Sequence, residues 1–225
     1  LGHDTIDASE AYGDSYIDLS GETHSQIENE DVYYTVGGTS AAPLNVQFLQ
    51  DLTGSFGDDI ANVRVLVPQI VTALRAVQAN SDFGVSSFVD KPISPFGVSG
   101  EWVYRMELGL TSDEALLAAT YNNLAIRFGN DGPEAQIESL MQLALHSAEV
   151  GFGPDSARFV VLFTDAPFHQ AGDGAVAGIL TPNNGDAIMD GGGIGEDYPF
   201  IPQVKAALEA ANIIPIFAIA GGYDP

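Results

Sequence analysis

An apolar run of strand length that ends in oxygen-bearing side chains constrains the fold of this chain more than any other stretch. The oxygens belong to Asp51, Thr53 and Ser55, which follow the run where a buried strand would stop. Asp58 and Asp59 then begin a helix, where carboxylates suit the positive end of the helix dipole. Carboxylates and hydroxyls are hard ligands of the kind that Mg²⁺ and Ca²⁺ prefer. The stretch therefore predicts a strand, a cation-binding turn and a helix in succession.

From residue 44 onward, segments with the periodicity of strands alternate with segments that have the periodicity of helices. The expected strands cover residues 45–50, 83–89, 102–108, 158–163 and 213–219, and the expected helices cover residues 59–79, 113–128, 134–148 and 200–211. Strands separated by helices are typical of a doubly wound α/β fold, in which helices flank a mostly parallel sheet. We therefore expect residues 44–225 to form one α/β domain.

Several elements have features that predict their place in the sheet or their ends. The continuous apolar run at 158–163 is typical of a central parallel strand, whereas the alternating pattern at 102–108 indicates a half-buried edge strand. Pro215 cannot donate a ladder hydrogen bond, so the last strand should lie near an edge of the sheet. Ser112 is expected to cap the helix at 113–128.

Acids that follow different strands should meet, because open α/β sheets bind ligands beyond the carboxyl ends of their strands. Asp51 follows the first strand, and Asp165 follows the strand at 158–163. Asp131 and Glu134 stand at the start of a helix on the same rim. We expect these acids to converge on one cation. The alternative, that the first acid and its hydroxyl neighbours form only a helix cap and a turn, stays open.

The composition is strongly acidic and lacks cysteine. The 225 residues carry a formal net charge of −24, which disfavours nucleic acid and anionic membranes as partners and favours divalent cations or a salty medium. The absence of cysteine excludes disulfides, thiolate catalysis and cysteine-based metal sites, and it fits a cytosolic protein as well as a bacterial surface protein. No run is expected to reach the apolar length needed to span a membrane, so membrane insertion is not expected. The first residue is not methionine, so we expect a piece of a longer protein.

Residues 1–43 differ from the rest and are expected to form an acidic β appendage and a linker. Two short strands are predicted at 14–19 and 31–36, and the Gly/Ser/Ala segment at 37–43 is typical of a linker. Residues 1–19 resemble the end of a calcium β-roll of the serralysin or RTX type. An ordinary acidic β-hairpin is the alternative.

Five blocks of residues occur in an order and spacing that belong to one known family. They are Asp51-Leu52-Thr53-Gly54-Ser55 followed by Asp58-Asp59, then Ser87 to Phe96, Asp131-Gly132-Pro133-Glu134, Phe163-Thr164-Asp165-Ala166 with His169, and Pro182-Asn183-Asn184-Gly185. Together the blocks resemble the I-like (βI) domain of integrin β subunits, a branch of the von Willebrand factor A (VWA) fold. The resemblance extends from residue 44 to about residue 220.

This resemblance implies three neighbouring cation sites. The central one would hold Mg²⁺ with Asp51, Thr53, Ser55, Glu134 and Asp165, and it would accept a carboxylate from a partner protein. One flanking Ca²⁺ site would use Asp58, Asp59 and Ser55. The other flanking Ca²⁺ site would use Asp90, Asp131, Glu134 and the Pro133 carbonyl; Gly129 stands where the family places an Asn.

Two departures from the family pattern limit which properties of the family can be expected of this chain. The segment Gly97–Glu101 is short and lacks cysteine where integrin β subunits have a long disulfide-closed loop, which argues against an integrin α-like partner. The family also continues beyond the strand at 213–219 with a helix, a strand and a final helix, whereas this chain ends at Pro225.

The favoured function is therefore metal-dependent adhesion, in which an Asp or Glu of a protein partner is captured at the central Mg²⁺. We expect a bacterial surface or secreted protein, from the acidity, the absence of cysteine and the β-roll resemblance. Two alternatives remain: a structural module of a large surface protein that Ca²⁺ stiffens, and a Mg²⁺-dependent hydrolase. The hydrolase lacks a clear nucleophile–base pair, so the chain is not expected to be an enzyme.

Four other features have ordinary structural interpretations. As the alternative to metal binding, Asp90 would cap a turn before Pro92, and His169 would be a packed or surface histidine rather than a ligand or base. Trp102 would pack on the sheet. The Gly-rich segment 190–195 would be a mobile surface loop rather than a phosphate loop, because no strand precedes it and no Lys follows.

Overall fold

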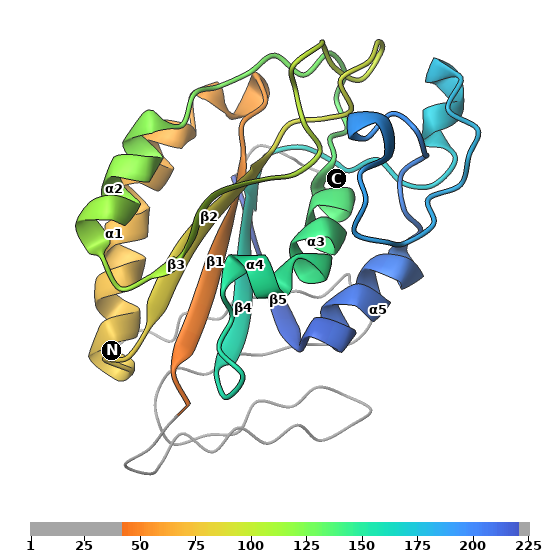
Figure 1. The fold of residues 1–225 in the computed structure, drawn as a ribbon. Coiled ribbons are helices and arrows are strands. Elements are labelled where there is room, and N and C mark those ends of the chain that lie inside the picture. Colours follow the sequence, from red (N-terminus) through yellow and green to blue (C-terminus); the bar gives the residue numbers. More distant parts are fainter. Residues whose placement is uncertain (1–41, 221–225) are drawn as a thin grey trace. The chain divides into compact units, whose positions relative to one another are not determined.

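A five-stranded sheet in the order β3-β2-β1-β4-β5 organises the computed structural model, which describes residues 42–220 (Figure 1). The strands are β1 (Leu44–Asp51), β2 (Asp82–Phe88), β3 (Arg105–Thr111), β4 (Ala157–Thr164) and β5 (Ile213–Ile219). The helices are α1 (Ile60–Val77), α2 (Glu114–Asn123), α3 (Gln136–Leu145), α4 (Ser147–Val150) and α5 (Ile201–Ala211), and short 3₁₀ turns are η1 (Ser55–Gly57), η2 (Asp173–Ala177) and η3 (Asp190–Gly192). The strands and linker predicted within residues 1–41 lie outside the described residues.

The direction of the strands confirms the predicted mostly parallel α/β fold. Strand β1 pairs in parallel with β2 and with β4, β4 pairs in parallel with β5, and only β3 runs antiparallel, at an edge. Asp51 is in register with Phe88 of β2, and Gln50 is in register with Phe163 of β4. The carboxyl ends of β1, β2 and β4 therefore lie at one rim. Strand β5 forms the other edge of the sheet, as Pro215 predicts.

The sheet is covered on both faces, so its central strand is buried on both sides. Figure 1 shows α1 and α2 on one face and α3, α4 and α5 on the other. Phe48 of β1 belongs to the core under α1 and α2, where its ring stacks on Phe83 at a centroid distance of 6.1 Å. The next residue, Leu49, belongs to the core under α3 and α5. Successive side chains of a strand point to opposite faces, which explains the continuous apolar run in this strand.

Helix α1 corrects the expectation that no segment could cross a membrane. With 18 residues it is long and apolar enough to be a candidate, by length and composition alone. Four of its apolar residues, at steps of three and four, are buried in the core between this helix and the sheet: Ile60, Val63, Val67 and Val71. That spacing is the stripe of an amphipathic helix that covers a sheet.

Two predicted boundaries are wrong because contacts between distant residues set them. The edge strand β3 begins at Arg105 rather than residue 102; Trp102 instead donates its indole N–H to Ser87 Oγ (3.0 Å) and lies under the Arg105 guanidinium. Helix α2 ends at Asn123 rather than Phe128. The guanidinium of Arg64, in α1, donates to the carbonyls of Tyr121 (3.2 Å) and Leu124 (2.8 Å), and so satisfies the carbonyls at the end of α2.

Candidate metal centre

The turn after β1 is held by hydrogen bonds to one buried carboxylate. Asp51 Oδ1 accepts from the backbone N–H of Thr53 (2.8 Å) and from its hydroxyl (2.6 Å). The Thr53 and Ser55 hydroxyls lie 3.2 Å apart. Ser55 Oγ in turn donates to Asp165 Oδ1 (3.0 Å), although the two residues are far apart in sequence. Four of the five predicted central ligands therefore form one connected group of oxygens.

Strand β4 fixes the second oxygen of the same carboxylate. The Thr164 hydroxyl, at the end of β4, donates to Asp51 Oδ2 (2.7 Å). Thr164 Oγ1 itself accepts from the side-chain amide of Gln136 (3.0 Å), which also donates to the carbonyl of Ala166 (3.0 Å). The first turn of α3 thus orients the carboxylate through a hydroxyl. Burial raises the pKa of Asp51 to about 6, and the hydrogen bonds from Thr53 and Thr164 oppose that rise.

Glu134, the fifth predicted central ligand, is buried between the central group and the acids of the second flanking site. Its backbone N–H donates to the carbonyl of Pro167 (2.9 Å), but its side-chain Oε2 has no hydrogen-bond partner among the described residues. Burial, followed by the charges of Asp90 and Asp51, raises its pKa to about 10. Gly129 packs against it so closely that a Cβ there would lie 2.9 Å from Glu134 Oε1. A buried carboxylate with a free oxygen among like charges is a fitting ligand for a cation.

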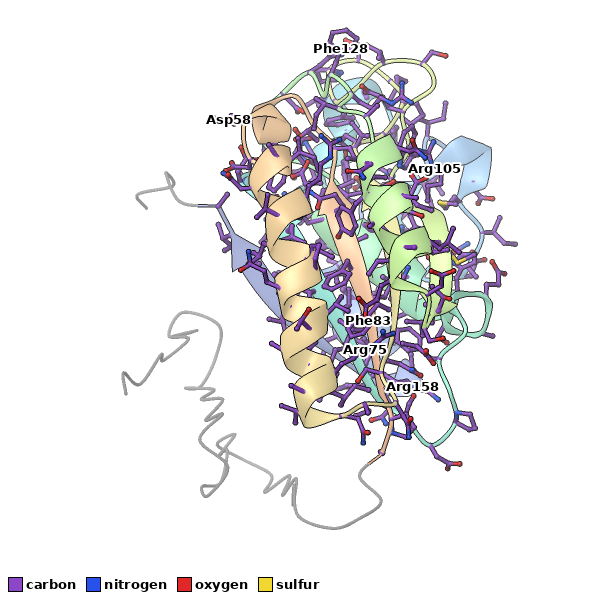
Figure 2. The ribbon with its side chains drawn as sticks, turned by 90° about the vertical axis from the view of Figure 1, so that its left-hand side faces the viewer. Asp58, Arg75, Phe83, Arg105, Phe128 and Arg158 are labelled. Atoms are coloured by element: carbon purple, nitrogen blue, oxygen red, sulfur yellow. The ribbon has the colours of Figure 1, made fainter. Side chains whose placement is uncertain are left out.

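The acids of the first flanking site lie near Asp165. Asp58 and Asp59 follow η1 at the start of α1, and both raise the pKa of Asp165, after burial as the larger cause. Asp59 occupies the N-cap position of α1 but makes no side-chain cap hydrogen bond. The hydrogen bonds therefore give no evidence that the Asp59 side chain serves only to cap the helix. Figure 2 shows Asp58 and the exposed Phe128 near one end of the molecule, and Arg75 and Arg158 towards the other.

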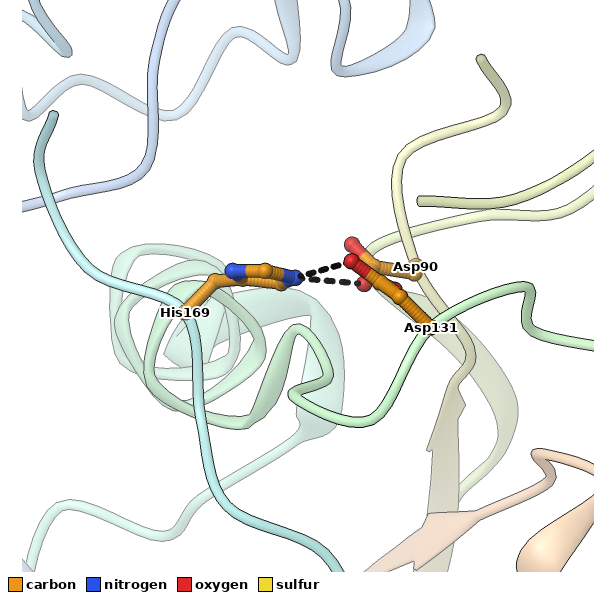
Figure 3. Close-up of side chains that lie close together, drawn as sticks. All are labelled: Asp90, Asp131 and His169. Carbon is orange, nitrogen blue, oxygen red and sulfur yellow. Dashed lines mark hydrogen bonds and ion pairs between the residues drawn. The ribbon is translucent and has the colours of Figure 1, made fainter. Parts of the chain in front are cut away.

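The acids of the second flanking site surround His169 (Figure 3). Asp90 follows β2, and Asp131 lies in the loop before α3. His169 Nε2 lies 3.2 Å from Asp131 Oδ2 and 3.6 Å from Asp90 Oδ2. One oxygen of Asp90 accepts from the Lys91 N–H (2.6 Å) and from the Tyr198 hydroxyl, and the other has no hydrogen-bond partner. Burial raises the pKa of Asp90 well above its ordinary value.

The hydrogen bonds and distances bring most of the predicted ligands into two adjoining groups at the rim. One contains Asp51, Thr53, Ser55 and Asp165, and the other contains Asp90 and Asp131. The ligand role of each, and of the Pro133 carbonyl, stays a prediction. The free buried oxygens of Asp90, Asp131 and Glu134 fit cation binding, because a buried polar atom without a partner is costly.

Several supporting residues escaped the sequence analysis. His169 is buried and its ring packs on Phe96 and Tyr198, which agrees with a packed histidine, but its contacts with two predicted metal ligands were not foreseen. The spacing Asp165-x₃-His169-x₃-Asp173 was the available signal. No local pattern marks Gln136, and Thr164 stands in the block 163–166 without a role assigned to it, because both residues act across elements. The segment 190–195 is exposed apart from Gly193, whose carbonyl accepts from the buried Lys91 ammonium (2.6 Å); its mobility stays a prediction.

The chain is similar in sequence to one known protein family and to several known proteins. The family model for the integrin beta chain VWA domain matches residues 39–224. Human integrin beta-7 is 30% identical over 205 residues, covering 81% of this chain and 26% of that protein. Integrin beta-2 of Ovis canadensis is 31% identical over 198 residues, covering 79% of this chain and 26% of that protein. Among solved structures, the open conformation of the pilus adhesin SpaC from Lactobacillus rhamnosus GG is 20% identical, covers 56% of this chain and 15% of that chain, and has a TM-score of 0.37.

The fold and rim thus define an α/β domain of the VWA type. The chain belongs to the integrin β chain VWA domain family. Domains of this family serve in metal-dependent adhesion to protein ligands and are not enzymes. This chain spans about a quarter of the length of these relatives.

Proposed function

We propose that this chain captures an acidic residue of a partner protein through a central Mg²⁺. Asp51, Thr53, Ser55, Glu134 and Asp165 would hold the ion. When bound, the ion supplies a positive charge with a coordination position open to an outside carboxylate. Such a site needs a buried floor that fixes the cation and an open side that a partner can reach.

The exposure of the five residues is the observation that carries this proposal. Asp51 and Thr53 have no exposed surface, and Glu134 is 2% exposed, so these three form a floor shielded from water. Ser55 is exposed and Asp165 is half-buried, so they form a lip on the solvent side. The backbone of Phe128 adjoins the same turn, because its carbonyl accepts from the Gly54 N–H (2.9 Å), and its large apolar side chain is 76% exposed. A partner can therefore approach the lip and pack on an aromatic ring beside it.

Two flanking sites belong to the same proposal. Asp58, Asp59 and Ser55 would hold Ca²⁺ on one side. Asp90, Asp131, Glu134 and the Pro133 carbonyl would hold a further cation on the other, predicted as Ca²⁺. We place the protein outside the cell or at its surface, as expected for an adhesive domain. A bacterial origin stays a prediction, because the relatives compared by sequence are animal integrins.

Matched substitutions at the two ends of β4 test the proposal. Asp165→Asn should abolish Mg²⁺ binding at the central site, as measured by calorimetric titration of the EDTA-treated chain with MgCl₂. Asp155→Asn should leave it unchanged, because this exposed acid precedes β4 at the opposite end. A peptide with one Asp should bind the immobilised wild-type chain in Mg²⁺ but not in EDTA, and its Asn counterpart should not bind.

The outcomes separate the adhesive function from the alternatives. If Asp165→Asn binds the Asp peptide as well as the wild type does, carboxylate capture is wrong. Stabilisation by Ca²⁺ without any peptide binding would instead support the structural module. Turnover of a phosphate ester that Asp51→Ala abolishes would support the hydrolase.

A further inference from the structure

A cleft lies between α1 and α2, which Figure 1 shows side by side on one face of the sheet. Contacts at both ends hold the two helices antiparallel. The guanidinium of Arg64, near the start of α1, donates to the carbonyl of Leu124, just after α2 (2.8 Å). Arg75, near the end of α1, pairs with Glu114 at the start of α2. Between these contacts the cleft encloses about 450 Å³, and volumes of roughly 300–1,000 Å³ are typical of small-molecule sites.

The lining of this cleft is mainly apolar. Val67, Val71 and Leu117 line it and are buried in the core. Pro68 of α1 and Ala118 of α2 line it from exposed positions, so a molecule can enter from the solvent side. The small side chain of Ala118 leaves space that a larger residue would fill. An apolar body would therefore gain from burial between the two helices.

One polar side chain of the lining is buried without a partner. Tyr121 also lines the cleft, is 2% exposed, and its hydroxyl has no hydrogen-bond partner among the described residues. Burial raises the pKa of Tyr121 well above its ordinary value. The ring meets Phe48 of β1 edge-on at a centroid distance of 6.1 Å, which fixes it in the core. A buried hydroxyl of this kind is costly unless it finds an acceptor or a donor.

We propose that this cleft binds a neutral, mainly apolar small molecule with one oxygen atom, which accepts a hydrogen bond from the Tyr121 hydroxyl. A neutral molecule fits because both charged residues of the lining, Arg64 and Glu114, already have partners. The net charge of −24 also disfavours an anionic ligand. The site goes beyond the proposed function, since none of its residues belongs to the candidate metal centre.

Titration with acetophenone, an aromatic ketone, tests this site in a buffer with Mg²⁺ and Ca²⁺. Amide NMR shifts of Val67, Val71 and Ala118 should change and saturate. Tyr121→Phe should weaken acetophenone binding by roughly 2–10-fold, the net value of one hydrogen bond. Ethylbenzene has a similar shape but no oxygen atom, so it should bind the wild type and Tyr121→Phe alike. This comparison isolates the hydroxyl from the apolar contacts.

Two adjacent alanines of α2 give a matched pair of variants that test the location. Ala118→Leu should abolish the binding of both compounds, because its side chain fills the cleft. Ala119→Leu should bind them like the wild type, since Ala119 is equally exposed but does not line the cleft. Without ligand, Tyr121→Phe should melt no lower than the wild type, because it removes a hydroxyl without a partner. A lower melting temperature would overturn the inference.

Three further outcomes would also overturn it: no saturable shift at the cleft residues, equal acetophenone affinity in Tyr121→Phe and the wild type, or equal losses in the two alanine variants. The cleft and the central metal site can fail separately. Asp165→Asn should retain acetophenone binding, because Asp165 does not line the cleft. A chain that captures the Asp peptide in Mg²⁺ but does not bind acetophenone would contradict only the inference drawn from the cleft.

Discussion

At the scale of single residues, the buried pair of Lys91 and Glu138 shows how this acidic chain uses its few cations. The chain has 7 Lys and Arg residues against 31 acids, yet Lys91 has no exposed side-chain surface. Its ammonium lies 2.8 Å from Glu138 Oε2, donates to Gly193, and lies 4.5 Å from the centre of the Tyr198 ring. Burial raises the pKa of Glu138 to about 7, and the Lys91 charge opposes the rise. The pair joins the end of β2, helix α3 and the Gly-rich turn behind the rim.

Removing the cation of this pair should destabilise the fold strongly. Lys91→Met leaves Glu138 buried without a partner, which should lower the free energy of unfolding by roughly 3–5 kcal/mol in a urea titration. Adding Glu138→Leu should recover much of the loss. Lys205→Met is the control: its i,i+4 pair with Glu209 (3.5 Å) is exposed, and the change should stay below about 1 kcal/mol. Equal losses at the two lysines would contradict this account.

At the scale of elements, the two ends of α2 are determined differently. A residue beside the helix caps its start, whereas contacts with another helix determine its end. Its N-cap is Asp113, whose carboxylate accepts from the Leu116 N–H (3.0 Å), so the prediction of Ser112 as the cap is wrong by one residue. Both residues have good capping side chains, and only the backbone path out of β3 decides between them. The opposite end of the helix depends on Arg64 from α1, as described above.

The two candidate caps give a direct comparison within one helix. Asp113→Ala removes the bond to Leu116 and should lower stability by about 0.5–2 kcal/mol. Ser112→Ala removes no hydrogen bond of the helix and should change stability by less than about 0.5 kcal/mol. Chemical denaturation of both variants measures the difference. A larger effect at Ser112 would show that the helix begins earlier in solution.

At the scale of the whole molecule, a chain with a net charge of −24 also gathers several acids at one rim of its sheet, where burial disfavours their charged form. Burial raises the pKa values of Asp51, Asp90, Asp131, Glu134 and Asp165, so the rim resists ionisation of all five together. A bound dication turns that mutual repulsion into attraction, and it stabilises the fold by mass action. Stability should therefore depend on cations and on pH together.

The sign of the pH dependence follows from the raised pKa values. In EDTA, stability should fall as pH rises from 3.8 to about 6, where Asp51 ionises, and further towards about 10, where Glu134 ionises. Metal ligands must be deprotonated, so cation affinity rises over the same interval. We expect Mg²⁺ with Ca²⁺ to raise the melting temperature by several degrees at about pH 8 and by much less at about pH 5. Scanning calorimetry with and without EDTA measures the melting temperature at each pH. An equal rise in melting temperature at the two pH values contradicts the prediction.

Local periodicity in the sequence determined the order of strands and helices. Apolar steps of three and four marked α1, and continuous apolar runs marked β1 and β4, because these patterns follow from the geometry of each element alone. The parallel order of the elements then placed Asp51 and Asp165 at one rim. The start of the following helix placed Asp131 and Glu134 on the same rim, and the family resemblance added Asp90 as a candidate ligand.

The tertiary structure alone decided the features that depend on contacts between distant segments. The end of α2 depends on Arg64, the orientation of Asp51 depends on Thr164, and the setting of His169 depends on Tyr198. None of these contacts produces a periodic pattern in the sequence, because each joins groups that only the folded backbone brings within a few ångströms of one another. The sequence thus determined where the predicted cation site lies, and the fold decided which side chains orient its candidate ligands.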